Sequence, residues 1–346
     1  MNNFIFQNST KVYFGKGCVK EYLACLTKEA NVVMLAYGGG SIKRNGIYEE
    51  VAGILQAAGK TIVEFPGIMA NPTYAKVQEG ARLARENRVD LILAVGGGSA
   101  MDCCKAVSLA ARYEGDIWED FWAQPGVVDF EPLTLGVIVT VAGTGGECNG
   151  GAVITHEEKK VKTGRDYPAC NPRFALMDPT YTYSVPMRQM VSGGFDILSH
   201  IMETYFSEPN EDNVSDGIIE ALMKSVIRNL RASIQNPEDY TARSNLMWDS
   251  TMAENRLIKM GKSAIFSATT WNISWALIPI ATMAAALPCC TPYITVIFTG
   301  TGCRSLCASL RMYGEFPETA EAMRRWPRRV CRRWPALSRN LACPPH

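Results

Sequence analysis

Three apolar segments in the first half of the chain each end in a cluster of glycines. They cover residues 31–37, 90–95 and 135–140, and the sequences that follow are GGGS, GGGS and VAGTGGE. Continuous apolar, β-branched runs of this length are typical of strands buried on both faces of a sheet. Residues 47–58 and 74–87 lie between them and show the periodicity of amphipathic helices. The alternation predicts an α/β domain with a parallel sheet covered by helices.

The glycine-rich turns are expected at the carboxyl ends of the strands, where open α/β sheets bind their ligands. Glycine allows a close approach of the backbone, and the N–H groups that open the next helix bind phosphate, so the turns predict a nucleotide site. They are not the GxGxxG fingerprint, and ordinary tight turns remain the alternative. The cofactor residues predicted in the first turn are Gly38, Gly39, Gly40 and Ser41. No acidic residue follows this turn closely, whereas Ser41 and Lys43 suit a 2′-phosphate, which favours NADPH over NADH.

Asp196 and His200 form a candidate metal-binding pair. A spacing of four residues places both side chains on one face of a helix, so a carboxylate oxygen and an imidazole nitrogen can converge on one cation. A surface hydrogen bond or a capping interaction is the commoner explanation of such a pair. The neighbouring residues are apolar, however, so the helix is expected to be largely buried, and buried ionisable groups need partners.

Length and composition limit the possible functions. At 346 residues, with 47% hydrophobic residues, the chain can build a sizeable core, and two domains are expected. A net charge of +1 argues against nucleic acid as a partner. The first residues lack a basic segment followed by an apolar one, so no secretion signal is predicted and a cytoplasmic location is expected.

Several segments, in order along residues 1–262, resemble those of one enzyme family. They are NP (71–72), GGGSAMDCCKA (96–106), TVAGTGGE (140–147), VITHEEKKVK (153–162), ALMDPTYTYSVP (175–186) and GFDILSHIMETY (194–205). The chain thus resembles the iron-containing, group III alcohol dehydrogenases, in particular the NADPH-dependent butanol dehydrogenase and aldehyde reductase branch. The resemblance implies a dinucleotide-binding α/β domain, similar to dehydroquinate synthase, over residues 1–182 and an all-helical metal-binding domain over residues 183–262. It also implies a homodimer built partly through residues 11–14.

The same resemblance implies roles for particular residues. For NADP(H) these are Gly97, Gly98, Ser99 and Asp102 at the pyrophosphate, and Thr140, Thr144 and Lys162 nearer the nicotinamide and its ribose. Asp196 and His200 become the first two ligands of Fe²⁺ or Zn²⁺. Two further ligand histidines, fourteen residues apart, are expected shortly after Gly261. The implied reaction is hydride transfer between the cofactor and a small alcohol or aldehyde.

The composition changes abruptly after Lys262. No histidine follows until His346, residues 263–303 carry no charged side chain, and residues 304–346 carry nine arginines and no lysine. A shift of the reading frame by one base, with permitted third bases, converts this stretch into a sequence similar to the family. The shifted sequence places histidines across codons 268/269, 272/273 and 282/283. We interpret residues 263–346 as an out-of-frame tail caused by the loss of one base in an A-rich run at Lys262.

Three hypotheses follow for the chain as written. The first is a metal-dependent alcohol dehydrogenase by descent, impaired because only two of four ligands are encoded. The second is a non-catalytic nucleotide-binding remnant. The third uses the tail, either as a membrane span, which its prolines disfavour, or as a nucleic-acid-binding segment rich in arginine and tryptophan. The sequence favours the first for ancestry and the second for behaviour.

Overall fold

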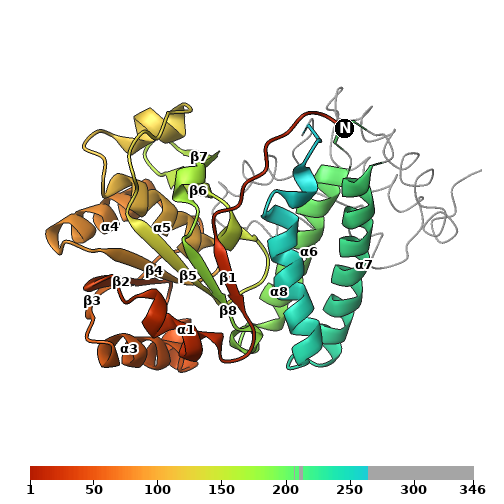
Figure 1. Ribbon diagram of the computed structural model, residues 1–346, viewed down its shortest axis with the longest axis horizontal. Helices are drawn as coiled ribbons and strands as arrows, with labels where there is room; N and C mark the ends of the chain where they lie inside the picture. Colours follow the sequence, from red (N-terminus) through yellow and green to blue (C-terminus); the bar gives the residue numbers. More distant parts are fainter. Residues whose placement is uncertain (206, 210–212, 264–346) are drawn as a thin grey trace, which may run out of the picture. The chain divides into compact units, whose positions relative to one another are not determined.

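A six-stranded sheet, parallel throughout, forms the first part of the protein. The computed structural model describes residues 1–205, 207–209 and 213–263. The strands, in spatial order, are β1 (Lys11–Phe14), β8 (Phe174–Met177), β5 (Thr134–Val139), β4 (Leu91–Gly96), β2 (Val32–Tyr37) and β3 (Thr61–Phe65). All five pairings between neighbours are parallel. The α/β architecture predicted from the sequence is confirmed (Figure 1).

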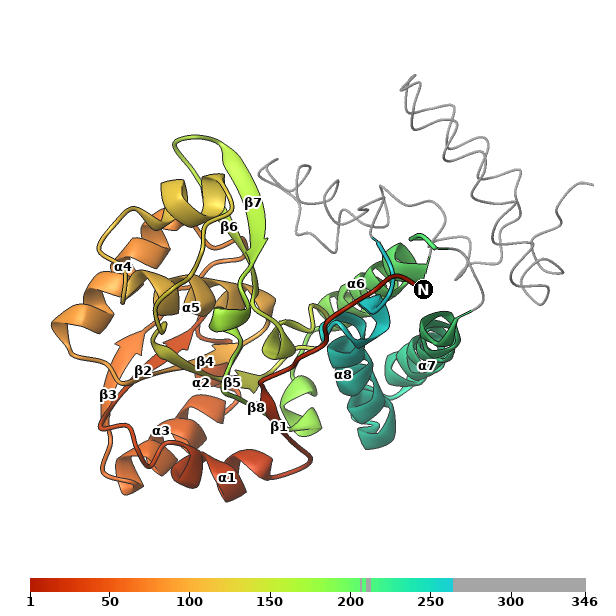
Figure 2. The ribbon, with the colours of Figure 1, turned by 45° about the horizontal axis from the view of Figure 1, so that its top comes forward.

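Helices cover both faces of this sheet, as the continuous apolar strands predict. Successive strand residues alternate between two hydrophobic cores: Met34 and Ala36 belong to one, Val33 and Leu35 to the other. The first core is closed by α4 (Tyr74–Glu86) and α5 (Gly98–Ala110), and the second by α1 (Cys18–Leu26) and α3 (Ile47–Ala57). Figure 2 shows these two pairs of helices on opposite sides of the strands.

The predicted element boundaries agree closely with the structure. The segments predicted at 31–37, 90–95 and 135–140 are β2, β4 and β5, each displaced by at most one residue at either end. Those predicted at 47–58 and 74–87 are α3 and α4. A short helix, α2 (Ser41–Arg44), follows the first glycine turn.

An antiparallel hairpin interrupts the alternation of strands and helices. It consists of β6 (Gly151–His156) and β7 (Val161–Asp166), which pair with each other and not with the large sheet. Helix α5 packs against β6. Because β7 carries Lys162, the hairpin brings a charged side chain from outside the sheet within electrostatic reach of Asp102 in α5.

The chain after β8 is helical within the described residues. The long helices are α6 (Met187–Tyr205), α7 (Val214–Gln235) and α8 (Tyr240–Glu254), and short 3₁₀ turns cover Pro179–Thr182 and Leu257–Lys259. The side chain of Asn213 caps α7, and that of Asp239 caps α8. The interpretation of residues 263–346 as an out-of-frame tail concerns, apart from Ser263, residues outside those that the structure describes. In the part of the chain that the structure describes, no helix is long and apolar enough to cross a membrane.

Asp249 is a buried carboxyl group between α7 and α8. Its Oδ2 accepts a hydrogen bond from the hydroxyl of Ser225 at 2.8 Å. Burial raises the pKa of Asp249 to about 7 from a usual value of 3.8, although Ser225 and Arg228 favour the ionised form. Below pH ~4 both the folded and the unfolded chain hold the proton. Between pH ~4 and ~7 only the folded chain keeps it, so this group lowers the stability of the fold as the pH rises.

We expect Asp249→Asn to stabilise the protein at pH 8 and to have little effect at pH 4.5. The difference between the two pH values should be on the order of 2 to 4 kcal/mol in the free energy of unfolding. Urea denaturation followed by circular dichroism measures it. Ser225→Ala is the control of opposite sign, because loss of the hydroxyl donor should destabilise the protein more at pH 8 than at pH 4.5. An effect of Asp249→Asn that is independent of pH would contradict this reading.

Candidate functional site

The second glycine turn opens a helix without a side-chain cap. Gly97 is the N-cap residue of α5, and no side chain caps the helix there. A methyl group at Gly98 would lie 2.5 Å from Cγ2 of Thr144, so only glycine allows the two turns to touch. The free N–H groups of a helix N-terminus and a backbone without side chains suit a phosphate group. The structure thus brings Gly97, Gly98 and Thr144 together, as the prediction requires.

The first glycine turn carries a cluster of charged and aromatic side chains. Lys43 Nζ lies 3.2 Å from Oε2 of Glu64 and 4.3 Å from the ring centroid of Tyr48. The hydroxyls of Tyr37 and Tyr48 each donate to the same carboxylate at 2.5 Å. Glu64 stands at the end of β3, so the acidic group near this turn comes from the neighbouring strand. Gly40, with a φ of +86°, lies in the left-handed region that favours glycine.

The third turn, which follows β5, is held by a serine of the helical part. The hydroxyl oxygen of Ser250 accepts hydrogen bonds from the backbone N–H groups of Gly143 at 2.9 Å and Gly145 at 3.1 Å. One residue further on, the hydroxyl of Thr251 donates to the buried carboxylate of Glu147 at 2.5 Å. Residues of α8 therefore fix the turn that is predicted to lie near the nicotinamide.

Helix α6 approaches the same turn through a glycine. The Cα of Gly143 faces Gly193, and a methyl group at Gly193 would overlap the carbonyl oxygen of Ala142. Oδ2 of Asp196 lies 3.8 Å from the position that a Cβ on Gly143 would occupy. The predicted metal ligand Asp196 thus lies against the predicted cofactor turn, although the two are separated by about fifty residues in sequence.

Lys162 is buried, Asp102 is half-buried, and both have partners. Oδ2 of Asp102 accepts a hydrogen bond from the N–H of Val153 in β6 at 3.1 Å, and burial raises its pKa to about 6, against the opposing effect of Lys105. Lys162 Nζ donates to Oδ1 of Asn71 at 2.7 Å. Burial lowers the pKa of Lys162, while Asp102 and Asp196 oppose this change. The charges of the cofactor residues and of Asp196 are close enough to affect one another.

Asp196 and His200 face each other at one turn of α6, as the spacing predicts. His200 Nε2 lies 3.7 Å from Oδ1 of Asp196, and His200 Nδ1 lies 3.3 Å from Oε1 of Glu254 in α8. Both side chains are largely buried, at 6% exposure for Asp196 and 12% for His200. Burial disfavours the charged form of His200, but Glu254 and Asp196 outweigh it and raise its pKa to about 9.

The pair fits half of a metal site. Two metal bonds of about 2.1 Å at a tetrahedral angle place their donor atoms about 3.4 Å apart, close to the observed separation. Oδ1 of Asp196 is buried and has no hydrogen-bond partner among the described residues, which is costly unless another ligand reaches it. Within residues 1–205, 207–209 and 213–263, no group of three or more His, Cys, Asp or Glu side chains is arranged to hold a metal ion.

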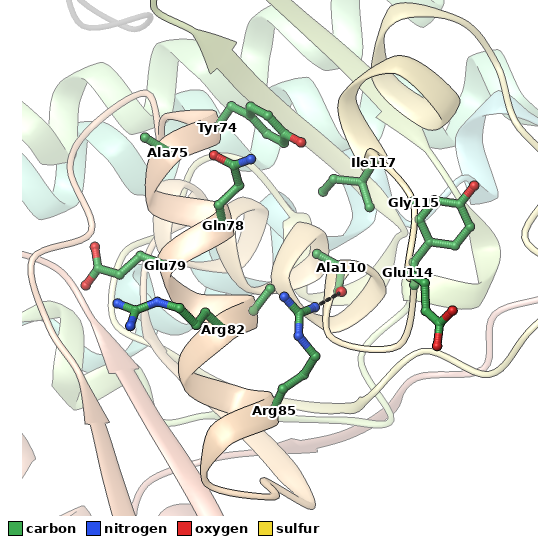
Figure 3. A pocket seen from close by; sticks show the side chains of 12 residues that line it. Tyr74, Ala75, Gln78, Glu79, Arg82, Arg85, Ala110, Glu114, Gly115 and Ile117 are labelled. Atoms are coloured by element: carbon green, nitrogen blue, oxygen red, sulfur yellow. Dashed lines mark hydrogen bonds between the residues drawn. The ribbon is translucent and has the colours of Figure 1, made fainter.

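An open groove lies away from these turns. It is bordered by α4 and by the end of α5 with the segment that follows (Figure 3). Arg85 crosses it and donates to the carbonyl oxygen of Ala110 at 2.7 Å. None of the predicted cofactor or metal residues lines this groove, so it is not part of the candidate site.

The glycine turns of a parallel sheet and a helix that carries a paired aspartate and histidine fit a metal-dependent oxidoreductase, and sequence comparison identifies the family. Residues 9–179 match the profile of the iron-containing alcohol dehydrogenases. Residues 190–277 match the C-terminal profile of the Fe-containing alcohol dehydrogenase family. The chain belongs to the iron-containing alcohol dehydrogenase family.

Individual relatives are of the butanol dehydrogenase and aldehyde reductase type. The chain is 40% identical over 267 residues to the NADH-dependent butanol dehydrogenase A of Clostridium acetobutylicum, covering 77% of this chain and 68% of that protein. It is 35% identical over 264 residues to the NADPH-dependent aldehyde reductase YqhD of Escherichia coli, covering 75% of this chain and 67% of that protein. The crystal structure of YqhD superposes with a TM-score of 0.78 and 32% identity, over 83% of this chain and 73% of that one. The crystal structure of the NADH-dependent butanol dehydrogenase A of Thermotoga maritima superposes with a TM-score of 0.80 and 31% identity, over 95% of this chain and 85% of that one.

Sequence reasoning missed several residues of this region. Glu254, Ser250 and Glu64 reach the site from elements that are distant in sequence, and nothing in their local sequence marks them. Lys105 is different, because a lysine within the apolar run of α5 is a visible anomaly. It is fully buried, and its Nζ donates to Oδ1 of Asn149 at 3.0 Å and to the carbonyl oxygen of Gly151 at 2.8 Å, behind the third turn.

We expect Gly193→Ala to destabilise the protein, because the added methyl group would meet a backbone oxygen that cannot move aside. Overpacking of this kind costs about 1 to 3 kcal/mol. Gly217→Ala is the matched control, since Gly217 lies in α7 with open space around it and a backbone that alanine can adopt. The control should be neutral or stabilising by up to about 1 kcal/mol. Equal melting temperatures for the two variants would show that α6 does not press against the third turn.

Proposed function

We propose that this chain carries the framework of an enzyme that transfers hydride between NADP(H) and a small alcohol or aldehyde. Its α/β domain, residues 1–182, would hold the cofactor, and residues 183–262 would supply part of a metal centre. The observation that carries the proposal is the contact between Gly193 and the third turn, which supports a metal pair, Asp196 and His200, beside the proposed nicotinamide site. Cytoplasmic location and a homodimer that uses β1 at the sheet edge are further parts of the proposal.

The proposed metal ligands are Asp196 and His200. Their oxygen and nitrogen donors suit a borderline ion, so Fe²⁺ and Zn²⁺ both fit. When bound, such an ion polarises the substrate oxygen and lowers the pKa of the alcohol. The task of the chain is to orient the two donors: α6 fixes their spacing, and burial keeps water from Oδ1 of Asp196, which accepts no hydrogen bond from the described residues.

The proposed preference for the phosphorylated cofactor rests on Lys43. Glu64 and the ring of Tyr48 hold its ammonium group beside the first turn, which reduces the entropy lost when it meets a 2′-phosphate. Lysine has three donors, so the contact with Glu64 leaves others for the phosphate. Against this, the carboxylate of Glu64 repels a phosphate, and relatives that use either cofactor are known by name. Binding measurements with NADPH and NADH therefore decide whether the attraction by Lys43 outweighs the repulsion by Glu64.

We expect Lys43→Ala to weaken NADPH binding about tenfold and NADH binding less than threefold, since a charge-assisted hydrogen bond contributes about 1.5 kcal/mol. Isothermal titration at low ionic strength measures both dissociation constants. Lys20→Ala removes the same charge from the surface of α1 and serves as the control. Equal losses for the two cofactors would argue against a 2′-phosphate site at Lys43.

A second candidate, a nucleotide-binding protein without catalysis, is favoured by one observation. The described residues supply two donors to the proposed metal and no group of three. On the interpretation that one base was lost at Lys262, the remaining two ligand histidines are absent from the protein. The chain as written should therefore bind NADPH but hold a metal weakly and turn over little substrate.

Frame restoration tests the proposal directly. Inserting one base at codon 262 should produce a protein that oxidises NADPH with butyraldehyde in the presence of Fe²⁺ or Zn²⁺. The chain as written should be slower by on the order of 100-fold or more, because the ion lacks half its ligands. Both proteins should bind NADPH with similar affinity, since the cofactor residues precede Lys262. Comparable turnover by the chain as written and the frame-restored protein would overturn the frame interpretation. So would resequencing of the gene that finds an intact reading frame at codon 262.

A further inference from the structure

We infer that Glu254 is a positioning residue for His200, holding the imidazole so that its other nitrogen faces the proposed metal beside Asp196. The inference rests on the proposed function, because it assigns a role around the metal site proposed there. Glu254 is the last residue of α8, and its carboxylate is mostly buried, at 15% exposure.

The geometry divides the two imidazole nitrogens between two carboxylates. Nδ1 of His200 lies 3.3 Å from Oε1 of Glu254, and Nε2 lies 3.7 Å from Oδ1 of Asp196. The two nitrogens point in different directions from the ring. An ion bound by Nε2 beside Asp196 is therefore out of reach of the carboxylate of Glu254, which faces Nδ1. Histidines that bind metals generally donate the other N–H to a carboxylate, a carbonyl or water, which fixes the tautomer and the ring orientation.

Glu254 is itself held in place. Its Oε2 lies 2.8 Å from Nζ of Lys259, which leaves Oε1 free to accept from His200. Its backbone oxygen accepts a hydrogen bond from Nδ2 of Asn149 at 3.2 Å. A Cβ on Gly145 would lie 2.7 Å from the Cβ of Glu254, so the start of this side chain packs directly on the third turn. The orientation of His200 is therefore tied to the turn predicted to lie near the nicotinamide.

The test uses the full chain labelled with ¹⁵N-histidine. The sequence contains three histidines, His156, His200 and His346, and His200→Gln identifies the signal of interest. We expect the Nδ1–H proton of His200 to be protected from exchange with solvent in the wild-type chain. It should be lost in Glu254→Leu and retained, with a changed chemical shift, in Glu254→Gln, whose amide oxygen still accepts. Glu220→Leu is the matched control for Glu254→Leu, because it removes the acceptor of a hydrogen bond from Tyr205, between α6 and α7.

Titration with Co²⁺ alone, followed by visible absorption, provides the second measurement. Loss of a carboxylate that orients a ligand typically weakens metal binding 10- to 100-fold, so we expect about that increase in the dissociation constant for Glu254→Leu. Asp196→Asn should lose the binding while keeping the protected Nδ1–H proton. Thermal melts and NADPH affinity of Glu254→Leu verify that the variant is folded.

The outcomes separate the two proposals. A protected Nδ1–H signal that survives in Glu254→Leu would overturn the role of Glu254. So would unchanged Co²⁺ affinity in that variant when Asp196→Asn abolishes binding. Co²⁺ uptake that Asp196→Asn leaves unaffected would instead overturn the metal site of the proposed function. Absence of uptake by the wild-type chain would agree with a site of only two donors, and the imidazole signal then decides the Glu254 contact by itself.

Discussion

The close contact between the turn after β5 and two helices of the following part determines the geometry of the candidate site. The N–H groups of Gly143 and Gly145 share one acceptor, the hydroxyl of Ser250, while Gly193 packs on the same turn without a side chain between them. Buried N–H groups without partners are costly, so these bonds hold the turn in one conformation. Because the turn also touches Gly98 through Thr144, the predicted cofactor residues and the proposed metal pair belong to one connected structure.

Features that depend on neighbouring residues could be predicted from sequence, whereas contacts between distant segments, such as this one, could not. Apolar runs of fixed period determine β2, β4, β5, α3 and α4, because the burial of a strand or a helix face depends on residues close together in the chain. The spacing of Asp196 and His200 likewise determines their common face. The residues that support the candidate site could not be predicted in this way. Ser250, Glu254 and Glu64 approach from other elements, and their roles depend on packing between segments that local sequence does not describe.

Two buried carboxylates around His200 illustrate how charge is handled in this site. Glu254 has both oxygens engaged, at 3.3 Å from His200 and 2.8 Å from Lys259, whereas Oδ1 of Asp196 meets His200 only at 3.7 Å and accepts no hydrogen bond from the described residues. A closely paired carboxylate is compensated for its burial, but one with only a long contact is costly unless a further ligand reaches it. The asymmetry separates a supporting residue from a proposed ligand without reference to any relative.

The glycine at position 193 has an evolutionary consequence. A protein that had lost its catalytic role would still need a residue without a side chain there, since any larger one would damage folding and expose the chain to degradation. Asp196 would be under a weaker restraint, because its Oδ1 accepts no hydrogen bond from the described residues and its ion pair with His200 is long, at 3.7 Å. In descendants of a damaged gene, packing glycines should therefore persist long after the donor atoms have drifted, and the record of ancestry would outlast the chemistry.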